Sequence, residues 1–234
     1  MATQTHENGE VDQQAERIEI PRLAPSKIEV PIVGHTQLCM HRWTEKAKKQ
    51  IRDDQTGKAK EGQDPKDPRY NFRASAYILE QNKREGWNNG DVPADELTFG
   101  FPAIGFKKAM VRGYKNAGLG PMTDARGAFY VYGVDDDELV TINHPPEYPE
   151  MREDMVTVGR GTADIRYRPT FKEWSATLRI EYMDSMIGVE QVAQALQHAG
   201  HGVGVGEYRP EKGGQWGKFR LADGGEQQIK SQLG

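Results

Sequence analysis

The chain has 234 residues, with 31 lysines and arginines against 35 aspartates and glutamates, one cysteine and a net charge of −4 at pH 7. This length suits one fairly large domain, or one domain with long insertions. The negative net charge excludes a protein that is basic throughout, so any surface for nucleic acid must be a local patch. Because Cys39 stands alone, no disulfide can form within the chain, which suits a reducing cytoplasm.

The sequence has no sign of a membrane segment. No apolar run approaches the roughly 20 residues needed to span a bilayer. The first residues lack the charged and apolar regions of a signal peptide. We therefore expect a cytoplasmic protein with no membrane partner.

The N-terminal quarter alternates between polar and strand-forming segments. Residues 1–25 are polar and acidic, which predicts a disordered arm. Residues 27–43 alternate in hydrophobicity and predict a long first strand with a break near Gly34. From residue 44 to 60 the only large apolar residue is Ile51, so no helix face there could be buried well. We predict an exposed basic insertion around 44–73; a solvated linker explains the same composition equally well.

The remaining chain shows clearer periodicity. Helices are indicated where apolar residues recur every three to four positions, and strands where they alternate. The elements predicted in chain order are a short strand at 76–82, a helix at 102–117, a strand at 126–134, a tight turn at 135–138, two short extended pieces within 155–169, a strand at 173–183, a helix at 189–200 and a strand at 216–222, followed by a flexible tail at 224–234.

Without the insertions, the predicted order is strand, helix, strand, strand, helix, strand. This βαββαβ order is that of a ferredoxin-like, or RNA-recognition-like, α+β fold. We expect two helices on one face of a four-stranded antiparallel sheet, built as a single domain over residues 26–223.

A glycine-rich segment with interspersed cations follows the second predicted helix, within residues 202–221. Glycine lets a phosphate approach the backbone without a clash at Cβ, and successive N–H groups in such a loop can bind an anion. Tyr208 and Trp216 offer faces on which bases could stack. A plain glycine-rich connection between helix and strand remains an alternative. The motif is not a P-loop or a dinucleotide fingerprint, so we expect no cofactor.

The first predicted helix carries a second group of cations. Lys108, Arg112 and Lys115 are spaced to share one helix face, with Lys107 beside them. A solvated helix face explains this pattern as well as a binding groove does. The predicted nucleic-acid-binding residues are Lys107, Lys108, Arg112, Gly204, Gly206, Tyr208, Arg209, Lys212, Gly213, Gly214, Trp216 and Lys218. A weaker third strip consists of Arg160, Arg166 and Arg168.

The glycine-rich segment also resembles the signature loop of the RAMP superfamily. The matching residues are Gly202, Gly204, Gly206, Gly213, Gly214 and Gly217, followed by Phe219. The segment FPAIGFKKAM at 101–110 is similar to the start of the first helix in the repeating backbone subunits of CRISPR effector complexes. This resemblance implies a ferredoxin-like fold, binding of single-stranded RNA or DNA along a groove, and copies that stack side by side. The long acidic arm and the acidic residues 135–154 depart from the family pattern.

Residues 27–222 also look similar to uncharacterised proteins of tailed bacteriophages, mainly through residues 151–178 and 204–221. That likeness implies no established activity. It extends the expected location to the cytoplasm of a phage-infected bacterium.

The sequence offers weak candidates for catalysis. Asp135, Asp136, Asp137 and Glu138 could hold Mg²⁺ in a nuclease, although their place at a turn favours a solvated acidic loop. His35, Cys39 and His41 fall on one face of an ideal strand and are residue types that bind zinc, but no fourth ligand is evident. We therefore predict neither a catalytic residue nor a bound metal.

The sequence thus favours a non-enzymatic protein that binds single-stranded nucleic acid, RNA over DNA, and that assembles with further copies of itself. The alternative is a structural or protein-interaction protein of a phage, which assembles with itself or targets a host defence complex.

Overall fold

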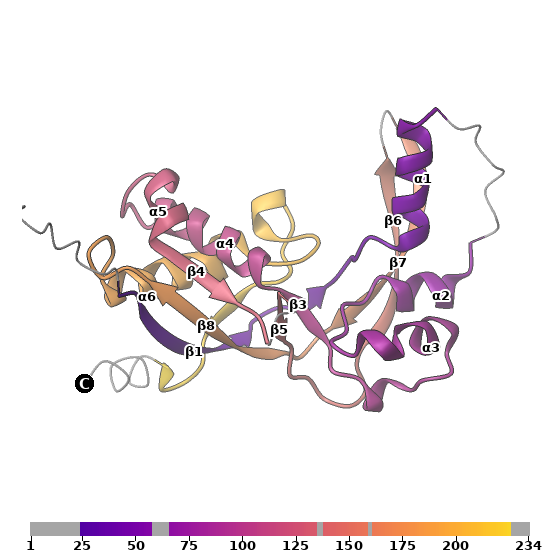
Figure 1. Ribbon diagram of the computed structural model, residues 1–234, viewed down its shortest axis with the longest axis horizontal. Coiled ribbons are helices and arrows are strands. Elements are labelled where there is room, and N and C mark those ends of the chain that lie inside the picture. The colour runs from indigo at the N-terminus through magenta and orange to yellow at the C-terminus, as the bar shows by residue number, and fades with distance from the viewer. Residues whose placement is uncertain (1–23, 58–65, 135–137, 159–160, 226–234) are drawn as a thin grey trace, which may run out of the picture.

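The computed structural model describes residues 24–57, 66–134, 138–158 and 161–225. The predicted arm at 1–25 and the predicted tail at 224–234 lie almost entirely outside these residues, as do Asp135, Asp136, Asp137 and Arg160. The molecule is elongated and has two lobes (Figure 1).

The first lobe is built on a four-stranded antiparallel sheet of order β4-β8-β1-β9. Helices α4 and α6 pack on one face of this sheet (Figure 1). Numbered along the core alone, the strand order is 2-3-1-4 with helices after the first and third strands, which is the ferredoxin-like arrangement. The predicted α+β ferredoxin-like fold is confirmed. The elements are β1 (Ser26–Gly34), α4 (Ala103–Asn116), β4 (Phe129–Tyr132), β8 (Ser175–Tyr182), α6 (Val189–His198) and β9 (Phe219–Leu221).

Alternating hydrophobicity places the core strands. Val30 lies opposite Leu178 and Ile28 lies opposite Ile180, and all four side chains are buried under the helices. Each such side chain contributes about 1.5–3 kcal/mol through burial. The intervening residues of β1 and β8 face away from the helices, so the period of two in the sequence defines the covered face of the sheet.

The two core helices approach each other closely at Gly113. A Cβ atom at this position would lie 2.2 Å from the carbonyl oxygen of Ala195 in α6. Only glycine permits this contact, which seats α4 and α6 together on the sheet.

The second lobe is formed by the two segments that interrupt the ferredoxin-like order. Its three-stranded antiparallel sheet has the order β2-β7-β6, and α1, α2 and α3 lie in the same lobe (Figure 1). A two-stranded pairing of β3 and β5 lies between the lobes (Figure 1). The elements are β2 (Leu38–Cys39), α1 (Glu45–Gln55), α2 (Pro68–Ala74), α3 (Arg84–Asn89), β3 (Gly100–Pro102), β5 (Leu139–Thr141), β6 (Glu150–Val158) and β7 (Thr162–Phe171).

Several local predictions require correction. Residues 45–55 form helix α1, although no apolar face is available; Thr44 Oγ1 accepts from the Ala47 N–H at 3.2 Å, and Lys48 pairs with Glu45 at 2.8 Å. Such local contacts can form a helix that stays largely exposed. The sequence predicted the exposure of this insertion but not its helix. The predicted strand at 76–82 is reduced to a single bridge between Ile78 and Phe99.

The predicted strands at 126–134 and 155–169 also differ from the structure. Helix α5 (Met122–Ala128) occupies the start of the first, and the strand begins only at Phe129. The second is part of one long hairpin, because β6 already begins at Glu150. Short stretches of sequence, taken one at a time, do not reveal a long hairpin, because the register of each strand depends on its partner strand.

No helix in the described part of the chain has both the length and the apolar character needed to cross a bilayer.

Candidate functional site

A cleft of about 180 Å³ lies where the glycine-rich segment meets the start of helix α4. Its lining comes from α4, from the segment after α6 and from the second lobe. The lining residues are His41, Tyr77, Phe101, Gly105, Lys108, Ala109, Val203, Gly204, Val205, Gly206, Glu207, Arg209 and Glu211.

The glycine-rich segment is held in place by backbone packing. It starts as a π-helical turn at Ala199–Val203 that continues α6, and it includes a short 3₁₀ turn at Pro210–Lys212. A Cβ at Gly217 would lie 1.7 Å from the carbonyl oxygen of Val205, and one at Gly206 would lie 2.4 Å from that of Cys39. These two glycines also have positive φ angles, 64° and 78°. They are therefore required by the packing of the segment itself.

Many backbone N–H groups of this segment already have partners. The N–H of Glu207 donates to Cys39 O at 2.9 Å, and that of Gly217 donates to Gln37 O at 2.7 Å. Gly213, Gly214 and Trp216 donate within the segment. A phosphate would therefore meet side-chain cations here more readily than a row of free N–H groups.

Lys108 is the cation of the cleft that lacks an acidic partner among the described residues. Arg209 pairs with Glu211 at 3.2 Å and also donates to the carbonyl oxygen of Gly206 at 3.0 Å. Glu207 pairs with Arg168 at 3.6 Å. The charges of the lining balance, with Lys108 and Arg209 against Glu207 and Glu211, but Lys108 is the described cation that remains free to bind a ligand anion.

The cations of α4 do not all lie on the same surface of the protein. Lys108 and Lys115 are exposed and Arg112 is half-buried, in agreement with the helix face predicted from their spacing. Arg112 donates to Met122 Sδ at 3.7 Å. Lys107 turns toward the sheet edge, where its Nζ lies 3.7 Å from the centre of the Tyr130 ring. Burial lowers the pKa of Lys107. Of these cations, the structure brings only Lys108 into the cleft.

The remaining predicted residues of the glycine-rich segment spread over a wider surface. Lys212 and Gly213 are exposed at the tip of the 3₁₀ turn. Gly214 lies against the backbone of Tyr208, where a Cβ would approach its carbonyl oxygen to 1.8 Å. Lys218 is half-buried, and its N–H donates to Thr36 Oγ1 at 3.0 Å.

Tyr208 and Trp216, the predicted stacking residues, contact each other. Their rings meet edge to face with centres 4.7 Å apart. The guanidinium of Arg152 lies 4.3 Å from the Trp216 ring, and that of Arg168 lies 5.5 Å from the Tyr208 ring. Cation–π contacts of this kind anchor both aromatic residues on the second lobe. Part of the surface of each ring is therefore already occupied by contacts within the protein.

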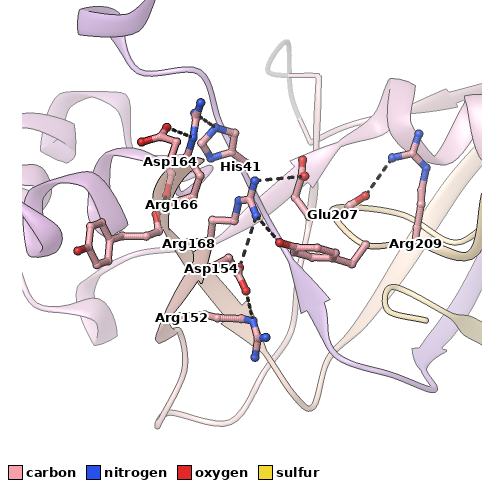
Figure 2. A network of polar contacts seen from close by, with 12 residues as sticks. His41, Arg152, Asp154, Asp164, Arg166, Arg168, Glu207 and Arg209 are labelled. Carbon is pink, nitrogen blue, oxygen red and sulfur yellow. Dashed lines mark hydrogen bonds and ion pairs between the residues drawn. The ribbon is translucent and has the colours of Figure 1, made fainter. Parts of the chain in front are cut away.

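A buried ionic network joins the glycine-rich segment to the sheet of the second lobe (Figure 2). Arg168 and Asp154 are each 6% exposed and pair at 3.4 Å. Arg152 binds the other carboxylate oxygen of Asp154 at 2.7 Å, and Arg168 also reaches Glu207 and the hydroxyl of Tyr208. The sequence marked Arg168 only as part of a weaker strip and did not indicate its partners. The alternation of Arg166, Arg168 and Thr170 along one strand was the available signal.

His41 and Cys39 lie beside this network. Burial, followed by the charges of Arg168 and Arg166, lowers the pKa of His41 to about 4. Burial raises the pKa of the Cys39 thiol to about 12. His35 is exposed while Cys39 is fully buried, so the three residues of the zinc alternative do not converge. No cluster of three or more His, Cys, Asp and Glu side chains suited to a metal occurs in the described residues.

Comparison with known proteins gives little guidance. No protein-family model matches the chain, and no curated protein matches it. The crystal structure of Cmr6 from Pyrococcus furiosus is similar over 86% of this chain and 100% of that chain, with a TM-score of 0.38 and 10% sequence identity. At this level the likeness carries no argument, and the ferredoxin-like assignment rests on the strand order.

Proposed function

We propose that this chain is a non-enzymatic protein that binds single-stranded nucleic acid, with RNA favoured over DNA. The observation that carries the proposal is the exposed cationic face of α4. Lys108, Arg112 and Lys115 have no acidic partner in the described part of the chain, and this face adjoins the cleft beside the glycine-rich segment. Unpaired cations along one face supply the phosphate contacts that dominate nucleic-acid affinity.

The resemblance of the glycine-rich segment to the RAMP signature loop supports the same proposal. According to this proposal, a single strand of nucleic acid runs along α4 and past the 3₁₀ turn at Lys212. Further copies of the protein bind beside it on the same nucleic acid. The phage origin of the chain remains a prediction that follows from the likeness to phage proteins.

Binding to labelled single-stranded RNA, single-stranded DNA and duplex DNA over a series of salt concentrations tests the proposal. The triple variant Lys108→Ala, Arg112→Ala, Lys115→Ala should weaken single-strand binding and lower the slope of log K against log salt by about two to three. The matched control is Lys27→Ala, Lys83→Ala, Lys172→Ala, which removes the same charge from cations that are already paired with acids. This control should retain most of the binding and its salt slope.

Failure to bind any of the three nucleic acids would overturn the proposal. Equal losses in the two triple variants would show that only net charge matters and would overturn the assigned surface.

A protein-interaction role is the second candidate, and two exposed apolar residues of the β6–β7 hairpin favour it. Met155 is 80% exposed and lies opposite Ile165, which is 41% exposed. Two exposed apolar residues paired on one face of the hairpin could form part of a contact with a partner protein. Met155→Lys would then change the mass measured by light scattering and leave single-strand binding intact.

A further inference from the structure

The cleft between α4 and the glycine-rich segment has the size of a site for one ring system. Its volume of about 180 Å³ lies below the range of roughly 300–1,000 Å³ typical of pockets that enclose drug-sized ligands. A single nucleobase is a ligand of suitable size, whereas a complete nucleotide would have to leave its sugar and phosphate outside.

The walls of the cleft suit a flat, partly apolar group. Tyr77 and Phe101 line it and meet edge to face with ring centres 6.2 Å apart. Val203, Val205 and Ala109 add aliphatic surface. Bases of single strands are unstacked and held in this way by aromatic and apolar side chains.

The polar groups of the cleft include two hydrogen-bond acceptors of one kind. Glu207 and Glu211 both line it; Glu207 lies 3.6 Å from Arg168, and Glu211 Oε2 accepts from both Nε and Nη2 of Arg209 at 3.2 Å, so that its Oε1 has no such contact in the described part of the chain. An ionised carboxylate offers about four acceptor positions, so both side chains retain the capacity to accept from a ligand. A base edge that presents two adjacent N–H groups can donate to these carboxylates, and a carbonyl oxygen next to them can accept from Arg209, which lines the same cleft.

Lys108 completes the arrangement at the mouth of the cleft. Because it lacks an acidic partner in the described chain, it can bind the phosphate that flanks an inserted base.

We propose that this cleft binds one unstacked guanine base of a single strand, with the adjacent ring N–H and exocyclic amine of the base donating to Glu207 and Glu211. Guanine is the base that places two such donors side by side on its Watson–Crick edge. This inference rests on the proposed single-strand binding and adds a base preference to it.

The test compares two nine-nucleotide RNAs that are uridine except at the centre, where one has guanosine and the other inosine. Inosine differs from guanosine only by the missing exocyclic amine. We expect the wild-type protein to bind the guanosine strand about tenfold more tightly, the size of one good base contact.

The double variant Glu207→Gln, Glu211→Gln should bind both strands within about twofold of each other. Its matched control is Glu85→Gln, Glu147→Gln, which makes the same charge change at two exposed residues that lie outside the cleft. The control should keep the tenfold preference. Since Glu207 also pairs with Arg168, the single variant Glu211→Gln provides the test if the double variant does not fold.

Equal wild-type affinity for the two RNAs would overturn the base site and leave single-strand binding in place. A preference that survives in the folded variants of Glu207 and Glu211 would overturn the assignment to these carboxylates. Absence of binding to either strand would overturn the proposed function together with this inference.

Discussion

The two sheets of the molecule place charge in opposite ways. In the core sheet, the face under α4 and α6 is apolar, and the charged residues lie on the other face, where Lys27, Glu29 and Arg179 are exposed in the described part of the chain. In the second lobe, Leu38 and Phe171 form an apolar face, while the opposite face carries Asp154 and Arg168 and is covered all the same. The glycine-rich segment provides that cover, through Glu207 and Tyr208. Alternation along a strand thus identifies which residues share a face, but does not reveal what lies over it.

The difference has an energetic consequence. Burial of apolar side chains stabilises the core sheet directly. On the covered face of the second lobe, two charges lose their hydration, and further groups add to their mutual attraction, although Arg168 Nε has no hydrogen-bond partner among the described residues. Arg152, Glu207 and Tyr208 supply those groups.

Breaking the buried ion pair is expected to have the largest effect. Arg168→Met should lower the free energy of unfolding by about 3–5 kcal/mol, because Arg152 is then the one described residue that still pairs with the buried Asp154. Adding Asp154→Leu makes this face resemble the core sheet and should recover most of the loss. Urea unfolding monitored by circular dichroism measures both.

The exposed pair of Lys172 and Glu150 on the same sheet is the control, and Lys172→Met should leave the unfolding midpoint nearly unchanged. If the double variant Arg168→Met, Asp154→Leu is as unstable as Arg168→Met alone, the stability of the charged face depends on the whole network and not on this ion pair.

A change in the covering segment should have the next largest effect. Gly217→Ala places a Cβ atom against the carbonyl oxygen of Val205 at a φ of 64°, and should cost about 2–3 kcal/mol as the segment shifts away from the second lobe. Gly213 has a similar φ of 80°, but a Cβ there would have no neighbouring atom within 4 Å, so Gly213→Ala should cost only about 1 kcal/mol. Equal losses in thermal unfolding would contradict the close-packing role of Gly217.

The smallest effect concerns the pH dependence that the charged face introduces. The pKa of His41 is about 4 in the folded protein and 6.5 in the unfolded chain, so the unfolded chain takes up the proton more readily between these values. The contribution of His41 to the free energy of unfolding is therefore fully present above about pH 6.5. It is lost as the pH falls toward 4, by about 1–2 kcal/mol at pH 5.

Unfolding measured at pH 7 and pH 5 checks this expectation. His41→Gln should reduce the difference between the two conditions, whereas His35→Gln, at an exposed position, should preserve it. An unchanged pH dependence in the His41 variant would assign the effect to other groups.

The sequence was most informative where a pattern is local. Ile28, Val30 and Ile32 mark β1, and the helical spacing of Val192 and Leu196 marks α6, because each pattern depends only on neighbours within a few turns. Helix α1 was missed since its support comes from a cap and an ion pair and not from an apolar face. The start of β4 was misplaced because Gly127 weakens the helical signal of the residues just before Phe129.

For the site, the sequence identified Lys108, Gly204, Gly206 and Arg209, which the structure gathers in one cleft. It also identified Tyr208 and Trp216 without indicating that they contact each other and two arginines of the β6–β7 hairpin. Glu207, Tyr77 and His41 were missed as cleft residues, because their common position depends on contacts between distant parts of the chain.

By itself, the sequence determined the order of the core elements and hence the ferredoxin-like fold, since hydrophobic periodicity is encoded residue by residue. Only the tertiary structure decided that Gly206, Gly214 and Gly217 press backbone against backbone, and that Asp154, Arg168 and Glu207 meet beside them. These partners lie up to 53 positions apart. Such distant residues become buried and form ion pairs with each other only when the chain folds.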